Sequence, residues 1–350
     1  MILHSPIFLR SPRHVSVAGL AGQITRVQLH IFNSPSSFPV APSYTLEKPI
    51  PSTLITENTY DIAPFIKRFI TFNSHVDGPT VVETPATHYC YCYVKVYLDG
   101  VLEDNLAGFT YKYICFDGFG WHQEGGNPTP PFSLMNEGTY YTEESNGLGN
   151  LTVWNPDTSL NDMYIQWAHP DGSPTFSTLL TNEMNNMPNV HPSLVGSGAN
   201  VDIFKGGQSI AQYKFTPICE PKYTPIKCDF VNKNGAWQRI VFFKASRSKL
   251  TVKTKDFNMM PSSVDFDTSK NVTQSFNING NESITVNTGW VLESYKQTIA
   301  ELMHSEHIKL NDKPVVLKTK STELQESINN KNINYKLEFN YAHSTLNYNS

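Results

Sequence analysis

Apolar and polar residues alternate along much of this chain, the pattern of half-buried β-strands. Ile226, Cys228 and Phe230 occupy every second position of one such run. Residues 232–235 follow with turn chemistry, because their Asn-Gly ending is suited to positive φ. A second strand is expected at residues 240–243. The segment therefore predicts a β-hairpin, and no acid–base pair, phosphate loop or metal cluster lies on it.

The first third of the chain, residues 1–116, predicts a β-rich domain with one short helix. Strands are expected at residues 24–32, 44–48, 88–98 and 106–116. The helix is expected at residues 60–70, where Asp61 can cap the first turn. Pro64 falls in that turn, where its missing N–H has no helical acceptor.

The last part, residues 215–350, predicts a second β-rich domain with the one long helix of the chain. Apolar residues at helical spacing place that helix at residues 290–303, starting from Trp290. Strands are expected at residues 240–243, 250–254, 273–286, 315–318 and 333–341. The last of these alternates strictly, with Leu337 and Phe339 on its apolar face and Lys336 and Glu338 opposite.

The middle of the chain, residues 117–214, is rich in Gly, Asn, Pro and aromatic residues. Short strands are expected at residues 151–154 and 163–167, within a loop-rich insertion or a small β-subdomain. We expect this region to contact other subunits or a partner and to lie outside the folding core. For the loop around Trp121, binding and packing both remain open. The expected interface residues are aromatic, as interface anchors often are: Trp121, Tyr140, Tyr141, Trp154 and Trp167.

These patterns together predict a mainly β fold: two β-sandwich-like units, each with one packed helix, and a loop-rich β insertion. The composition agrees, since 39% of residues are hydrophobic and only 17% are charged, against about 25% in typical domains. Low charge also suits surfaces that meet other protein surfaces, because charged residues are depleted in interface cores.

Charge and cysteine content narrow the classes of partner. The net charge of −4 provides no global basic field for nucleic acid, and the lysines between Lys249 and Lys255 are expected on a solvated strand face.

Cys90 and Cys92 share one face of a strand, and all five cysteines are expected to be reduced in a protein made in a cytoplasm. The N-terminus does not have the pattern of a signal peptide, and no apolar run is long enough to predict a membrane span.

Candidate catalytic groups are sparse. His304 and His307 have a spacing that could hold a metal, but a helix C-terminus also favours such residues through its dipole. Glu143, Glu144 and Asp162 could act as paired carboxylates only across a cleft. The sequence contains no nucleophile elbow, Walker loop, dinucleotide fingerprint or zinc-protease motif. We therefore expect no enzymatic activity, cofactor or metal.

Three segments resemble structural proteins of tailed bacteriophages that infect Bacteroidetes, including crAss-like and flavobacterial phages. The first is the strand at residues 24–32 with its flanking motifs at 5–8, 44–48 and 60–66. The second is the Cys219-Glu-Pro-Lys-Tyr-Thr-Pro-Ile motif with residues 230–238 and 241–244. The third is the end of the chain, with the expected helix, the short strand at Val315 and the final strand at residues 334–343. The resemblance covers both ends of the chain and omits the middle.

The resemblance implies a non-enzymatic virion protein that is made in the host cytoplasm. It would be a multimeric component of a tail, neck or baseplate ring, with other virion proteins as partners. The alternative is a host-surface or glycan-binding tail module that uses residues 117–214. An enzyme such as a depolymerase is the third class.

Overall fold

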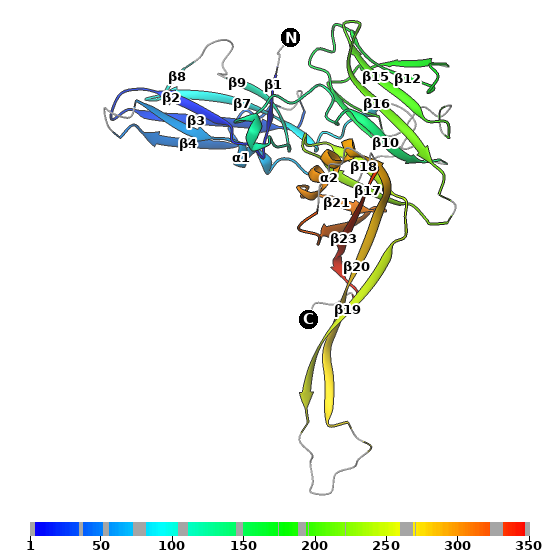
Figure 1. Ribbon diagram of the computed structural model, residues 1–350. Coiled ribbons are helices and arrows are strands. Elements are labelled where there is room, and N and C mark those ends of the chain that lie inside the picture. Colours follow the sequence, from blue (N-terminus) through cyan, green and yellow to red (C-terminus); the bar gives the residue numbers. More distant parts are fainter. Residues whose placement is uncertain are drawn as a thin grey trace. The chain divides into compact units, whose positions relative to one another are not determined.

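A computed structural model describes residues 4–34, 38–51, 56–72, 82–103, 111–144, 150–173, 175–187, 194, 196–220, 222–259, 269, 271–322 and 332–346 (Figure 1). The chain forms two compact units. The first comprises Met1–Cys219, Asp229–Ile240 and Gln297–Glu306, and the second comprises Glu220–Cys228, Val241–Lys296 and His307–Ser350. The predicted domains 1–116 and 117–214 therefore both lie in the first unit, and the predicted domain 215–350 is divided between the first and second units.

The N-terminal part of the first unit is a β-sandwich-like layer pair with one short helix. Its elements are β1 (Ser5–Phe8), β2 (His14–Ala18), β3 (Ile24–Phe32), β4 (Tyr44–Pro49), β5 (Glu57–Asp61), α1 (Ala63–Lys67), β7 (Tyr89–Leu98), β8 (Val101–Leu102) and β9 (Tyr111–Phe116). The larger sheet has the order β1-β9-β7-β3-β4, and β2 pairs with β5 in a second sheet. Alternate residues of both sheets share one hydrophobic core, including Val15, Tyr60, Leu29 and Val94. Ile66 of α1 completes this core.

The middle of the chain builds a second layer pair. Its elements are η1 (His122–Glu124), β10 (Gly138–Glu143), β11 (Leu151–Trp154), β12 (Met163–Ala168), β13 (Thr175–Leu179), β14 (Met184–Met187), β15 (Ala199–Lys205) and β16 (Gln208–Ile218), joined by β6 (Val82–Glu83) from the N-terminal part. Five strands follow the order β10-β16-β15-β12-β13, and three follow β11-β14-β6. The core that both sheets share includes Val153, Ile165, Val201 and Ile203.

A third apolar cluster joins these two parts of the first unit. It contains Phe8, Tyr91 and Phe116 from the N-terminal sheet and Trp154 and Met184 from the three-stranded sheet. The separate sheets agree with a change of architecture near residue 117. The shared cluster explains why both parts nevertheless form one compact unit.

The predicted hairpin is present as β17 (Ile226–Val231) and β18 (Trp237–Phe242). Gly235, in its turn, has a φ of 79°. A Cβ atom at this position would lie 2.8 Å from the backbone nitrogens of Asp117 and Gly118, closer than real Cβ atoms approach backbone. Both conformation and space therefore require glycine at this turn.

The second unit contains the strands β19 (Arg247–Asn258), β20 (Thr273–Leu292), β21 (Ile308–Leu310), β22 (Lys313–Leu317) and β23 (Asn332–Ser344). They lie in the order β21-β22-β23-β20-β19. On β23, Ile333, Tyr335, Leu337 and Phe339 are buried, as the strict alternation predicted. The paired residues of β20, such as Val286, are buried with them.

The prediction of a long helix at residues 290–303 is wrong. β20 continues through Leu292, and the 3-10 turn η3 (Glu293–Tyr295) precedes a helix α2 of only Lys296–Met303. Trp290 pairs with Asn334 of β23 and is 64% exposed. Strand pairing with β23 therefore decides the conformation of residues 290–292. After Leu292, the apolar residues Tyr295, Ile299 and Leu302 are buried, at the helical spacing that the sequence predicted.

The N-terminal helix is also shorter than predicted, because residues 57–61 pair with β2 as strand β5. Ile62 occupies the N-cap position of α1. Asp61 still accepts a hydrogen bond from the Ala63 backbone at 3.2 Å and another from the Arg13 backbone at 3.0 Å. Overall, 55% of residues lie in strands and 7% in helices, so the mainly β fold class is confirmed.

Candidate assembly interface

Three of the five expected interface aromatics are buried in the first unit. Tyr140 and Trp167 belong to the core of the middle sheets, and Trp154 to the cluster that joins the two parts. Each is between 4% and 5% exposed. The Trp167 indole N–H donates to the Met187 sulfur at 2.7 Å. This burial corrects the expectation for these three residues, because their side chains have no exposed area to offer a partner.

Trp121 and Tyr141 are half-buried. The Trp121 ring packs edge-to-face against Phe119 and His304, with ring centroids 5.1 Å apart in each case. The loop around Trp121 is thus folded onto its own unit. Of the two interpretations left open for this loop, packing is the one for which the structure shows contacts.

The expectation for the middle region as a whole is also wrong. We expected residues 117–214 to lie outside the folding core, but they build two sheets around a core of their own. Aromatic residues in a Gly/Asn-rich segment can pack inward as readily as they can bind, and sequence composition does not separate the two. Replacing this region by a linker would remove core, so it is unsuited as a test of assembly.

The His304 and Glu306 side chains have partners within the first unit. The His304 Nδ1 lies 2.7 Å from the Ala300 carbonyl oxygen. Glu306 accepts from the Lys67 ammonium at 2.7 Å and lies 3.4 Å from the Arg10 guanidinium. His307, the second histidine of the motif, belongs to the second unit. Lys67, which pairs with Glu306, also lies close to the buried carboxyl group of Asp117.

Asp117 is 3% exposed, and the Lys67 nitrogen lies 3.7 Å from its Oδ1. Burial raises the pKa of Asp117 to about 6, against the opposing effect of Lys67 and Arg10. In the unfolded chain the pKa has its ordinary value of 3.8. The folded state therefore binds more protons than the unfolded state between these two values.

We expect this difference to make the protein lose about 3 kcal/mol of stability as pH rises from about 4 to about 6. The Asp117→Asn variant should not show this loss. Denaturant melts across this pH range measure it, with Glu57→Gln, a change at an exposed carboxyl, as the control that keeps the wild-type profile. A wild-type-like profile in Asp117→Asn would contradict the assignment.

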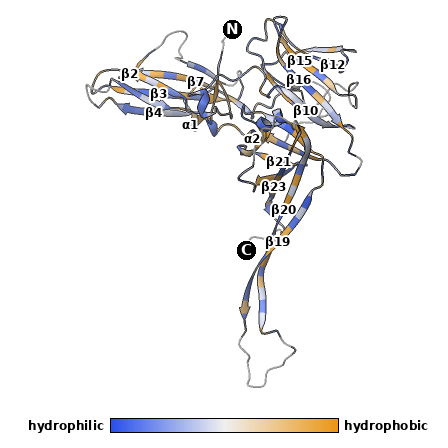
Figure 2. Cartoon of the chain, in the orientation of Figure 1, coloured by the Kyte–Doolittle hydropathy of each residue, from blue (hydrophilic) through white to orange (hydrophobic). Residues whose placement is uncertain are grey.

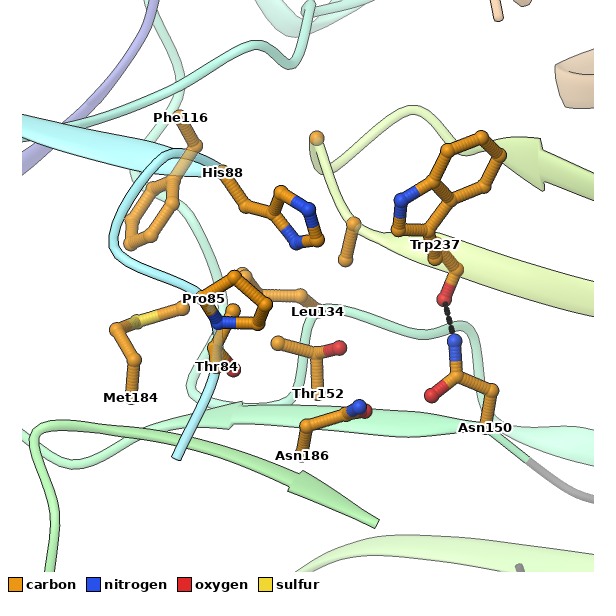
Figure 3. Close-up of a pocket in the computed structure, with 12 residues that line it drawn as sticks. Thr84, Pro85, His88, Phe116, Leu134, Asn150, Thr152, Met184, Asn186 and Trp237 are labelled. Atoms are coloured by element: carbon orange, nitrogen blue, oxygen red, sulfur yellow. Dashed lines mark hydrogen bonds between the residues drawn. The ribbon is translucent and has the colours of Figure 1, made fainter. Parts of the chain in front are cut away.

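The first unit also contains a small enclosed pocket, lined by Thr84, His88, Asn150, Asn186 and Trp237 among others (Figure 3). Figure 3 shows Asn150 donating to the Trp237 carbonyl oxygen, a bond of 2.6 Å. Thr84 Oγ1, Asn150 Oδ1 and Asn186 Oδ1 are buried without a partner among the described residues. The pocket has a cavity volume of about 20 Å³, which fits one water molecule. It is therefore too small for an organic substrate.

The most distinctive surface lies in the second unit, where β19 and β20 form a long hairpin (Figure 1). β23 pairs with β20 only from Asn281 to Leu292. Beyond that point, β19 and β20 pair only with each other within the described residues. We call residues 247–258 and 273–282 the arm; at its base, Asn281 still pairs with Ser344 of β23 and the Gly280 carbonyl oxygen accepts from the Thr345 backbone. Every residue of β19 is exposed.

The arm exposes several large apolar side chains to solvent. Leu250 is 57% exposed, Val252 is 53% exposed, and Phe257 and Phe276 are each more than 40% exposed. Figure 2 shows hydrophobic segments alternating with hydrophilic ones along β19 and β20. The Phe257 and Phe276 rings contact each other edge-to-face, with centroids 5.6 Å apart. Such apolar groupings on a surface mark interaction sites.

The sequence predicted both strands of the arm and its solvated lysine face, but not the exposure of its apolar residues. The alternation of Phe276, Ile278, Ile284 and Val286 predicts one buried face, yet only Ile284 and Val286 are buried. Asn277, with a φ of 50°, marks a bulge that shifts the register between the two halves. The signal that could have found the arm is the lysine-rich partner strand, whose polar alternation gives no core face.

No protein-family description and no curated protein matches this chain. Among solved structures, the chain is similar to the calcium-binding domain CBD12 of CALX1.1. The sequence identity is 11% and the TM-score is 0.18, over 57% of this chain and 75% of that chain. A likeness at this level carries no argument about fold or function. Among the described residues, no helix has the length and apolar character needed to cross a membrane.

Proposed function

We propose that this chain is a structural subunit of a tailed-phage virion, a tail, neck or baseplate ring component that acts through protein–protein assembly. The observation that carries the proposal is the exposed arm of β19 and β20. A two-stranded hairpin by itself is only marginally stable in water. An arm that also exposes Leu250, Val252, Phe257 and Phe276 is stabilised when a partner covers it.

Two further features support this proposal. The three segments at the chain ends resemble virion proteins of Bacteroidetes phages, and low charge with abundant Asn and Tyr suits a subunit with many protein neighbours. The proposal assigns no catalytic step, cofactor or nucleic-acid contact to the chain. Its partners would be copies of itself and other virion proteins.

The test is the assembly state of the purified full-length chain. We expect mass photometry and electron microscopy to show a closed ring of fixed copy number at micromolar concentration. Mass spectrometry of purified phage particles should find the chain in several copies per particle. A chain that stays monomeric at all concentrations and is absent from particles would contradict the proposal.

A second candidate function is a host-surface or glycan-binding tail module in the middle region. One observation favours it. A hollow of about 380 Å³ lies over β10, β15 and β16, lined by polar side chains that include Asn200, Asp202, Gln212 and Lys214. Amide and carboxylate groups of this kind hydrogen-bond sugar hydroxyls. Binding of the monomer to a glycan array, lost on Asp202→Ala, would favour this function over assembly.

A further inference from the structure

The register of the arm sorts its side chains onto two faces. Residues paired across β19 and β20 share a face, and β19 itself runs without a break. One face therefore carries Arg247, Lys249, Lys253 and Lys255. All four are exposed, and within the described part of the chain none forms a salt bridge with a carboxylate. This row is a linear array of exposed cations; within the described residues, Lys249 interacts electrostatically with Glu338, and the other three have no carboxylate partner.

The same face ends in aromatic side chains. Phe257 follows the row on β19, and Phe276 lies opposite Lys255 on β20. Their edge-to-face contact at the far end of the arm gives the cationic face an apolar tip. Phenylalanine is one of the aromatic residues that are enriched in protein interfaces.

The reverse face carries no cation; its side chains are apolar, polar and acidic, and include Asp256 and Glu282. It carries Leu250 and Val252, which lie opposite Glu282 and Gly280. A nucleic acid would pair with the cations but would be repelled by the net charge of −4 of the whole chain. Lysines on an edge strand also discourage edge-to-edge strand pairing. The two faces of the arm, and not its edge, are therefore the surfaces available to a partner, and the partner is protein.

The charge balance identifies that partner. The arm carries four cations together with Asp256 and Glu282, a net charge of +2. The whole chain has a net charge of −4, so the sequence outside the arm carries −6. Outside its arm, a second copy of this chain therefore carries a net negative charge, opposite in sign to that of the arm. Opposite net charges of this kind steer association and disfavour arm-to-arm contact.

We infer that the arm docks, through its cationic face and aromatic tip, on the acidic remainder of a second copy of this chain. The contact joins two different surfaces and is therefore heterologous, the type that closes into rings or extends into filaments. This inference rests on the proposed assembly function and specifies its contact. It makes assembly sensitive to salt, because the screening length falls from about 10 Å at 0.1 M to about 3 Å at 1 M.

The experiment compares two charge-reversal variants of the full chain. Lys253→Glu with Lys255→Glu reverses the arm, and Lys320→Glu with Lys336→Glu reverses two exposed lysines elsewhere with the same change in net charge. The arm variant should weaken assembly by at least about tenfold, while the control keeps it. Both should melt within about 2 °C of wild type, because all four positions are exposed.

A mixing experiment tests the heterologous geometry. The arm variant keeps the remainder of the chain intact, so it should cap wild-type chains and convert rings into short open oligomers. If the arm variant still assembles like wild type, the inference is overturned and the proposed assembly function stands. If wild type itself never assembles, both fail. Binding of wild type to a random 30-nucleotide DNA, lost in the arm variant while assembly persists, would overturn the inference in favour of nucleic acid.

Discussion

Replacing Arg239 with methionine is expected to destabilise the first unit by about 3 to 5 kcal/mol, the cost of leaving a buried charge without its partner. The Arg239 guanidinium donates to both carboxylate oxygens of Asp229, at 2.6 Å and 2.9 Å. Asp229 is 3% exposed and Arg239 is 6% exposed. Because methionine fills a similar space, the loss measured by denaturant unfolding reports the unpaired Asp229 carboxylate and not a large cavity.

The matched control removes both charges together. The double variant Asp229→Val with Arg239→Met should be closer to wild type than Arg239→Met alone, since replacing both members of a buried pair costs less than breaking it. A double variant as unstable as the sum of the two single variants would mean that the two side chains are not energetically coupled.

Leu337→Ala and Phe339→Ala are each expected to destabilise the second unit by about 2 to 5 kcal/mol, through lost burial and the cavity that remains. Both side chains are 0% exposed on β23. β23 lies between β22 and β20 in its sheet, so neighbouring strands limit how far the site can collapse. Thermal or denaturant unfolding of each variant gives the measurement.

Lys336→Ala is the control from the opposite face of the same strand. Its side chain is exposed, so its effect should stay below about 0.5 kcal/mol. Equal losses for Lys336→Ala and Leu337→Ala would show that β23 does not bury the face that its alternation predicts.

Local pattern was enough to locate most strands. The strand predicted at residues 24–32 is β3, and the one at residues 151–154 is β11, with the same bounds. The alternation of Leu337 and Phe339 predicted which face of β23 is buried. Side-chain period is a property of the strand itself, so it can be read without knowledge of the partner strands.

The long helix and the interface aromatics could not be predicted in this way. Trp290 has both helical spacing and a place in a strand, and its pairing with Asn334 decides between them. That pairing joins segments distant in sequence. Tyr140, Trp154 and Trp167 lie in a turn-rich segment, and only the sheets around them show that they pack inward.

The sequence by itself determined that this protein is mainly β, where its strands lie, and which face of the last strand is apolar, because alternation acts over a few neighbouring residues. Only the tertiary structure decided that the middle region has its own core, that the segment around Trp290 is a strand, and that the outer part of the arm, beyond Gly280, has no third strand beside it among the described residues. These outcomes depend on contacts between distant segments, and the free energy of such contacts overrides local preference.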